Sequence, residues 1–327
     1  MSIASRAFDR LPSLVALLRS GKRHLGPVEL SLGIEPARRG IMNRRDFVKK
    51  GAESFARYHL FYLASGTLAW AKQGLAVPEY FTEKANSTPS ICESCFPSIV
   101  KWGGKTFCAP AAVSNSLVWL ANNGFPSLQP FHDDNPQVAQ ARLVNMLGDV
   151  MGTSEHSGTS PSSVFSGLKQ FLGDRNVKYK RMAAVGGRNV PDFVAVDDSS
   201  VKLNWLKEGV LGKSSEWILI GWYKYDSQTD SYRIYDGHWM TVVGFGKNRA
   251  GRNDPEVLIV HDPAERAERK NYYPRIIPLR HGTLTDNDPK SHDEARPANL
   301  ALSISGDVVL KPGADFGIIQ GAYRLEL

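Results

Sequence analysis

The stretch KWGGKTFCAPAAVSNSLVWLANNG, residues 101–124, places a single cysteine between a glycine-containing loop and a helical pattern. Apolar residues recur every three to four positions from Ala109 to Leu120, the period of a helix buried along one face, and Gly124 is a typical stop signal. Pro110 fits the first turn of a helix, where its missing N–H costs nothing. The pattern predicts that Cys108 lies at a helix N-terminus, an environment that favours thiolates.

A lone cysteine at the start of a helix can equally be a small buried side chain. A nucleophilic cysteine needs a base and a third residue that orients the base. Among the eight histidines, His238 lies in the strand-like run YDGHWMTVVGFG, 130 residues after Cys108, and the next apolar run, EVLIVHDPA, ends in Asp262. His261 should point to the opposite face of its strand from Asp262, so His238 is the preferred base.

The surrounding chain changes character along its length. An arm without periodicity, residues 77–98, is followed by helical patterns at 109–122, 136–151 and 161–173. Strand-like runs follow at 177–185, 217–226, 232–247, 256–262 and 269–279, with one further helix near 200–209. Helices first and strands later predict an α+β fold with an antiparallel sheet in the second half. Four tryptophans of this half are expected in the core rather than in a groove: Trp205, Trp217, Trp222 and Trp239.

Three short motifs also resemble a known family. CAPAAVSNSLVWL, GHWMTVVGF and VLIVHDPA, in that order, are similar to the cysteine, histidine and aspartate motifs of C39-like, papain-fold cysteine peptidases, over roughly residues 95–280. The resemblance implies a papain-like fold with Cys108 as nucleophile, His238 as general base and acid, and Asp262 as the residue that orients His238. It implies a peptide or protein substrate and requires no metal or organic cofactor.

One position departs from that family. Its enzymes usually carry a glutamine about six residues before the cysteine, whose side-chain N–H helps to bind the oxyanion, and here that position is Trp102. Removal of one oxyanion donor typically costs about 10²–10³ in turnover. Either Trp102 or Lys105 replaces the glutamine, or the protein is slow or inactive. Two functions are therefore carried forward: an exported cysteine peptidase or amidase, and a catalytically inactive papain-fold binding protein.

Cys92 and Cys95 form a C-x-x-C pattern in the arm. A zinc site would need a second pair of ligands, and a thioredoxin-like pair would need a βαβ context. In an oxidising compartment the simplest arrangement is a local Cys92–Cys95 disulfide that leaves Cys108 free, although free thiols and a metal site stay open as alternatives.

The N-terminal part holds all of the excess charge. The chain has a formal charge of +7, yet residues 1–71 carry 12 Lys and Arg against 5 Asp and Glu, and residues 72–327 carry 28 of each class. Because the body is neutral, a nucleic-acid partner is not expected.

Residues 42–71 resemble a twin-arginine signal peptide, with Arg44 and Arg45 before a 12-residue uncharged run, 60–71, that ends in the A-x-A sequence AWA. The run is too short to span a bilayer, so no stable membrane span is expected. The pattern predicts a periplasmic or secreted protein that uses the twin-arginine export machinery, with a domain at 72–327. An amphipathic helix packed on the domain is the alternative. Residues 1–41 are an uninformative extension, which a mis-assigned start would explain.

Overall fold

The computed structural model describes residues 77–187, 189–264, 267, 269–285 and 295–327. The expected extension at 1–41 and signal peptide at 42–71 lie outside the described residues. The described residues all belong to one compact unit of the chain.

The helical patterns in the sequence correspond to helices in the structure. After the short helix α3 (Glu83–Ser87) and the 3₁₀ turn η3 (Lys101–Gly104) come α4 (Cys108–Asn122), η4 (Pro126–Leu128), α5 (Pro136–Val150), α6 (Pro161–Gly173) and α7 (Leu203–Val210). Both α5 and α6 begin at a proline, after an Asn135 or Ser160 side chain that accepts a hydrogen bond from a first-turn N–H. Local sequence signals therefore set where these helices begin.

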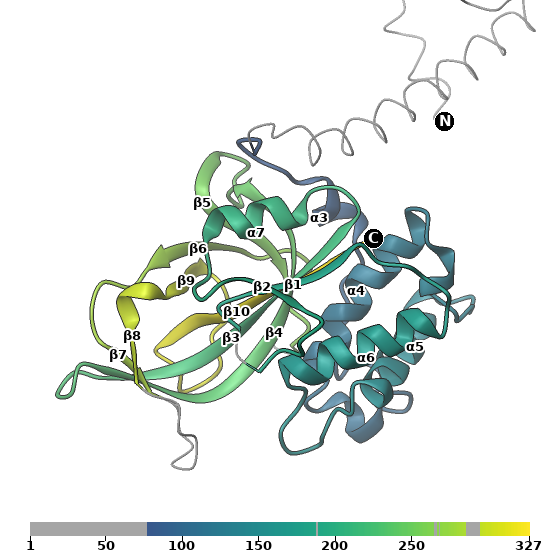
Figure 1. The fold of residues 1–327 in the computed structure, drawn as a ribbon, viewed down its shortest axis with the longest axis horizontal. Helices are drawn as coiled ribbons and strands as arrows, with labels where there is room; N and C mark the ends of the chain where they lie inside the picture. Colours follow the sequence, from purple (N-terminus) through teal and green to yellow (C-terminus); the bar gives the residue numbers. More distant parts are fainter. Residues whose placement is uncertain (1–76, 188, 265–266, 268, 286–294) are drawn as a thin grey trace, which may run out of the picture. The chain divides into compact units, whose positions relative to one another are not determined.

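Six long or medium strands close into an antiparallel barrel (Figure 1). They are β3 (Ser214–Asp226), β4 (Ser231–Lys247), β5 (Asn253–His261), β6 (Tyr273–Pro278), β9 (Leu302–Asp307) and β10 (Phe316–Glu326). Each pairs with the next in this order, and β10 pairs with β3 to complete the ring. The remaining strands extend the sheet from β10 or β4: β1 (Arg181–Val185), β2 (Ala195–Asp198), β7 (Thr283–Thr285) and β8 (Arg296–Pro297), the last followed by the turn η5 (Ala298–Leu300).

The papain-like α+β fold expected from the sequence is wrong, because the antiparallel strands close on themselves instead of forming the sheet of a papain-like domain. Two strands that the sequence pattern did not reveal, β9 and β10, complete the ring. Register shifts in β4 and β10 mark bulges, which bend and twist long strands enough to close a barrel.

Two apolar cores lie on the two faces of the barrel wall. Alternate residues such as Ile218, Met240 and Val260 form the inner core, which is the face that strands of a closed barrel turn toward its axis. Their neighbours, among them Trp217 and Trp239, pack on the outside against α4, α5 and α6, which group on one side of the barrel (Figure 1). Trp217 lies in the core as expected, whereas Trp222 and Trp239 are buried but also line a cavity, and Trp205 is only partly buried.

Candidate active site

The loop before Cys108 has an unusual backbone. Trp102, Gly103, Gly104 and Thr106 all have positive φ, of 51°, 65°, 82° and 67°. Left-handed conformations of non-glycine residues are costly and cluster at functional sites. The Thr106 hydroxyl donates to Ser154 O at 2.8 Å, which ties the loop to the chain before α6. The loop therefore enters α4 along a fixed path.

Helix α4 begins at Cys108 and is anchored to the barrel one turn later. The carbonyl of Ala112 accepts hydrogen bonds from Trp217 Nε1 on β3, at 3.2 Å, and from Thr241 Oγ1 on β4, at 2.7 Å. Because α4 is buried along most of its length, its start cannot shift without breaking these contacts. The Cys108 side chain is half-buried at the start of α4, and its thiol is free, because Cys108 takes part in no disulfide bond.

His238 and Asp262 come from neighbouring strands of the barrel. His238 pairs with Ile220 of β3, lies two residues before inward-facing Met240, and stacks on the Trp222 ring with centroids 6.0 Å apart. Asp262 directly follows His261, the last residue of β5, and it lies two positions after Val260, which faces inward. By the two-residue period, both side chains belong to the inner face at one rim of the barrel.

The His238 ring is hydrogen-bonded to Asp262 and lies beside Cys108. His238 Nε2 lies 2.6 Å from Asp262 Oδ1, which also accepts the Ala264 N–H at 2.9 Å. The Cys108 sulfur lies close enough to His238 to raise the pKa of the imidazole, and with Nε2 facing the carboxylate, Nδ1 is the ring nitrogen left for sulfur. The three residues that the sequence singled out are thus brought together, and the imidazole stands between sulfur and carboxylate.

Electrostatics favour a charged imidazole in this position. Burial by itself lowers the pKa of His238, but the Asp262 carboxylate, its hydrogen bond and the Cys108 sulfur outweigh burial and raise the pKa from 6.5 to about 10. His238 is therefore an imidazolium at neutral pH. A buried cation between two acidic groups is the arrangement that a thiolate–imidazolium nucleophile requires.

These residues open onto a cavity of about 560 Å³. Cys108 and His238 lie in its wall with Trp222 and Trp239, and the segment 156–161 also lines the cavity. The Lys311–Asp236 ion pair lies in the wall as well. The cavity has the size and mixed lining of a site for a small ligand or an extended peptide segment.

Comparison of the chain with known protein families, curated proteins and solved structures finds no match. The resemblance to C39-like peptidases therefore consists of the three short motifs, and function has to be inferred from the geometry of the site.

The two expected oxyanion donors lie in different places. The indole of Trp102 is 43% exposed, packs edge-on against Phe107 with centroids 5.7 Å apart, and does not line the cavity. Lys105 is exposed and does line the cavity, beside Thr106 and Cys108. The first backbone N–H groups of α4 also lack intrahelical acceptors, as at any helix start. Lys105 and the start of α4, rather than Trp102, are the candidate donors that face the cavity.

His261 lies away from the thiol. Its Nδ1 is 3.0 Å from Pro89 O and its Nε2 is 2.8 Å from the Asn271 side-chain amide, so the ring fastens the arm to β5. Burial lowers the pKa of His261 from 6.5 to about 4, and this histidine is neutral at pH 7. Its contacts agree with the preference for His238 as the base.

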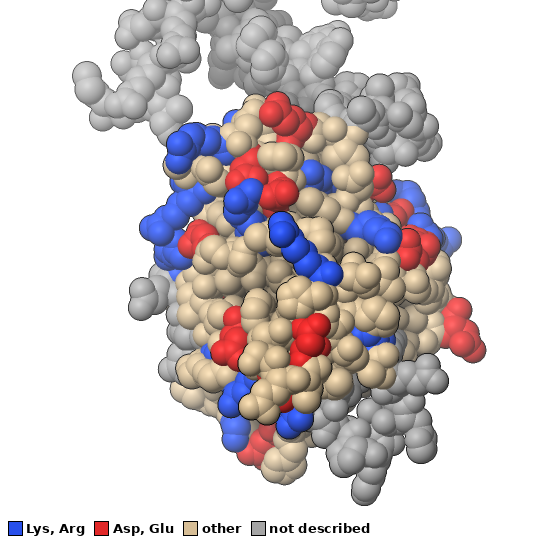
Figure 2. Space-filling view, turned by 90° about the vertical axis from the view of Figure 1, so that its left-hand side faces the viewer, with Lys and Arg blue, Asp and Glu red and all other residues tan. Residues whose placement is uncertain are grey.

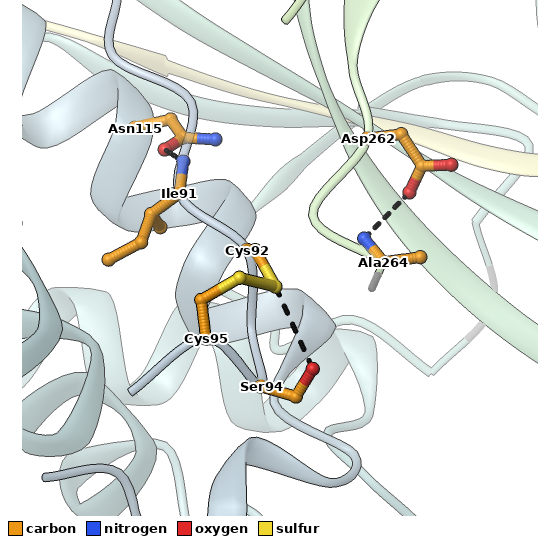
Figure 3. Close-up of a disulfide and its surroundings, with 7 residues drawn as sticks. All are labelled: Ile91, Cys92, Ser94, Cys95, Asn115, Asp262 and Ala264. Carbon is orange, nitrogen blue, oxygen red and sulfur yellow. Dashed lines mark hydrogen bonds between the residues drawn. A yellow bond between two sulfur atoms is a disulfide. The ribbon is translucent and has the colours of Figure 1, made fainter. Parts of the chain in front are cut away.

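Cys92 and Cys95 form a disulfide in the arm, close to the loop that carries Asp262 (Figure 3). Glu93, between the two cysteines, lines the cavity with Cys108. Sequence reasoning gave no role to Glu93 or to Gln320 in the cavity wall, and it expected Trp222 in the core rather than in a groove. The disulfide turn of the arm brings Glu93 to the site, and the pairing of β10 with β3 brings Gln320, so no local sequence signal marks these two residues.

The surface and the helices bear on possible partners. Within the described part of the chain, none of the helices combines the length and the apolar character needed to cross a membrane. Figure 2 shows Lys and Arg interspersed with Asp and Glu on the face it displays. Such a mixed surface fits the neutral charge of residues 72–327.

Proposed function

We propose that this protein is a cysteine hydrolase that cleaves a peptide or related amide bond by acyl transfer. One observation carries the proposal: buried His238 is hydrogen-bonded to Asp262 and lies with Cys108, whose sulfur raises the pKa of the imidazole, in the wall of a cavity of about 560 Å³. A thiol at a helix N-terminus, paired with an oriented imidazolium, is the arrangement used for nucleophilic cysteine chemistry.

The residues have distinct roles in the proposed reaction. The Cys108 thiolate adds to the carbonyl carbon, and the imidazolium of His238 gives its proton to the leaving amine as the C–N bond breaks. The thioester then reacts with water, whose proton passes to His238, and the acid and thiolate are released. Asp262 keeps the imidazole oriented and compensates its charge, since its Oδ1 holds Nε2 at 2.6 Å.

The proposal is tested by proteolysis and labelling in parallel. Wild-type protein is incubated with a peptide library, products are identified by mass spectrometry, and iodoacetamide labelling of Cys108 is timed at pH 6. We expect wild-type protein to cleave members of the library, and we expect Cys108→Ala and His238→Ala to lose this activity. His281→Ala is the matched control, because His281 is exposed and pairs with Asp230 at 2.8 Å in a similar His–Asp contact away from the cavity. Equal cleavage by wild type and Cys108→Ala would overturn the proposal.

A binding protein is the second candidate, and the position of Trp102 favours it. The indole that occupies the place of the usual glutamine lies outside the cavity wall, so the site has one fewer side-chain donor than the resembled enzymes. In that case Cys108 would label rapidly while no member of the library is cleaved. Retention of uncleaved peptides by immobilised protein would then identify the ligand class.

We also propose that the protein is exported through the twin-arginine machinery to the periplasm or beyond. The Cys92–Cys95 disulfide supports an oxidising compartment. N-terminal sequencing of protein from its native host tests the proposal, and an end near Lys72 is expected. Soluble protein that retains Met42 would contradict it.

A further inference from the structure

The disulfide turn, residues 92–95, touches the loop that carries Asp262. The Glu93 N–H donates to Pro263 O at 2.8 Å, one residue beyond Asp262. The Ala264 N–H in turn donates to Asp262 Oδ1 at 2.9 Å (Figure 3). The turn therefore buttresses the loop that directs the carboxylate toward His238.

The same turn touches the loop that leads into Cys108. Gly104 packs directly on its backbone, since a Cβ at that position would lie 1.7 Å from Glu93 O and 2.8 Å from Ser94 Cα. Just before the turn, the Ile91 N–H donates to Asn115 Oδ1 on α4 at 3.1 Å (Figure 3). The turn thus packs between the loop that leads into Cys108 and the loop that follows Asp262.

We propose that the Cys92–Cys95 disulfide turn is a redox-sensitive positioning element of the candidate active site. It does not enter the chemistry; it holds the Asp262 loop and the Gly104 loop at the spacing that lets His238 contact Cys108 and Asp262 together. This inference concerns the regulation of the site and rests on the proposed function.

The effect of the bond is local. A disulfide that closes so short a loop, with a sequence separation of 3, restrains the unfolded chain far less than one that closes a long loop. The residues of the turn make no strand or helix, so without the bond little but these few contacts fixes their path. Loss of the bond should loosen the site without unfolding the barrel.

The bond is accessible to a reductant, because Cys95 is exposed. A dithiol attacks one sulfur of the bond and forms a mixed disulfide, then its second thiol displaces the protein sulfur. Two electrons and two protons pass to Cys92 and Cys95, which become thiols, and the dithiol becomes a disulfide. The contacts of the turn with the Asp262 loop and the Gly104 loop are held in the oxidised form and weakened in the reduced form.

The test compares the full chain with a Cys92→Ser/Cys95→Ser variant by two measurements. Amide hydrogen exchange at Glu93 and Ala264 reports the two bonds directly and needs no substrate. The labelling rate of Cys108 with iodoacetamide, followed across pH 5–9 by peptide mass spectrometry, reports the state of the nucleophile pair. We expect exchange at both amides to accelerate at least about tenfold, a loss of about 1.4 kcal/mol of local stability, and the pH–rate profile of labelling to change shape.

Two comparisons control the test. Ser94→Ala keeps the disulfide and removes only a hydroxyl 3.7 Å from Cys92 Sγ, so it should behave as wild type in both measurements. Dithiothreitol should convert wild type to the behaviour of the double variant, reversibly, and leave the double variant unchanged. Unchanged exchange at both amides overturns the positioning role, whether or not Cys108 is reactive. Faster exchange with an unchanged labelling profile also overturns it, because the turn would then be structural only. The proposed hydrolase fails by a different result, cleavage independent of Cys108.

Discussion

His238 Nε2 lies 2.6 Å from Asp262 Oδ1, and the two side chains are 5% and 1% exposed. A buried carboxylate beside a buried imidazole stabilises the charged form of the ring, which is why the pKa of His238 is raised to about 10 in spite of burial. In the proposed hydrolase, this pair keeps a proton available for the leaving group.

Replacement of Asp262 by asparagine tests the charge while keeping the shape. The amide oxygen can still accept from Nε2, but the coulombic support is lost, so the pKa of His238 should fall, as an NMR titration of the ring would show. Cleavage should fall at least about tenfold, which corresponds to 1.4 kcal/mol of lost stabilisation. Asp230→Asn, in the exposed pair with His281, is the control and should leave both quantities unchanged. An unshifted His238 titration would contradict the role of Asp262.

His261 makes the protein sensitive to acid. Because its pKa is about 4 in the folded state and near 6.5 when unfolded, the unfolded chain binds the extra proton between these values. The contribution of His261 to stability is therefore complete above pH 6.5 and is lost, at up to about 1.4 kcal/mol per pH unit, as the pH falls toward 4.

His261→Gln should lower the free energy of unfolding at pH 7, because the substitution weakens the hydrogen bond to Pro89. On acidification, the variant should then lose less stability than wild type, because it lacks the titrating imidazole. Urea unfolding at pH 7.0 and pH 4.5 measures both. His132→Gln alters an exposed histidine and serves as the control. Identical pH dependence in wild type and His261→Gln would refute the assignment.

Gly104 is expected to tolerate no side chain. Both Gly104 and Gly152 have positive φ, of 82° and 60°, which costs a non-glycine residue about 1–2 kcal/mol. A Cβ at Gly104 also lies 1.7 Å from Glu93 O, whereas one at Gly152 has nothing within 4 Å. Gly104→Ala should thus lower the free energy of unfolding by about 1–3 kcal/mol more than Gly152→Ala, the typical cost of overpacking. Chemical denaturation compares the pair, and equal losses would mean that the disulfide turn moves aside freely.

Local signals in the sequence were sufficient for the helices and for the triad candidates. Pro110 and the apolar period after Ala109 indicated the start of α4, and the two-residue period placed His261 and Asp262 on opposite faces. These features depend on neighbours along the chain, which a single sequence displays.

Closure of the sheet into a barrel could not be predicted from local sequence patterns. Alternation in β3 and β4 indicates two differently packed faces but not whether the far ends of the sheet meet, and the pairing of β10 with β3 joins residues about a hundred positions apart. β9 is short and contains Ser303, Ser305 and Gly306, which weakens its strand pattern. The resemblance of three motifs to papain-fold enzymes predicted the wrong sheet, although the barrel still brings Cys108, His238 and Asp262 together. The same long-range pairing of β10 with β3 is what brings Gln320 to the cavity.

In the proposed hydrolase, Lys105 is the side chain to change in order to identify the oxyanion donor. Its position in the cavity wall three residues before Cys108 lets an ammonium group approach the carbonyl oxygen under attack. Donors that act on the developing charge support turnover rather than substrate binding, so Lys105→Met should lower kcat by about 10²–10³ with little change in KM. Lys101→Met is the matched control, because Lys101 is exposed and paired with Asp149 outside the cavity wall. The measurement uses a peptide cleaved in the library screen. An unchanged kcat in Lys105→Met would mean that the backbone N–H groups at the start of α4 bind the oxyanion without this side chain.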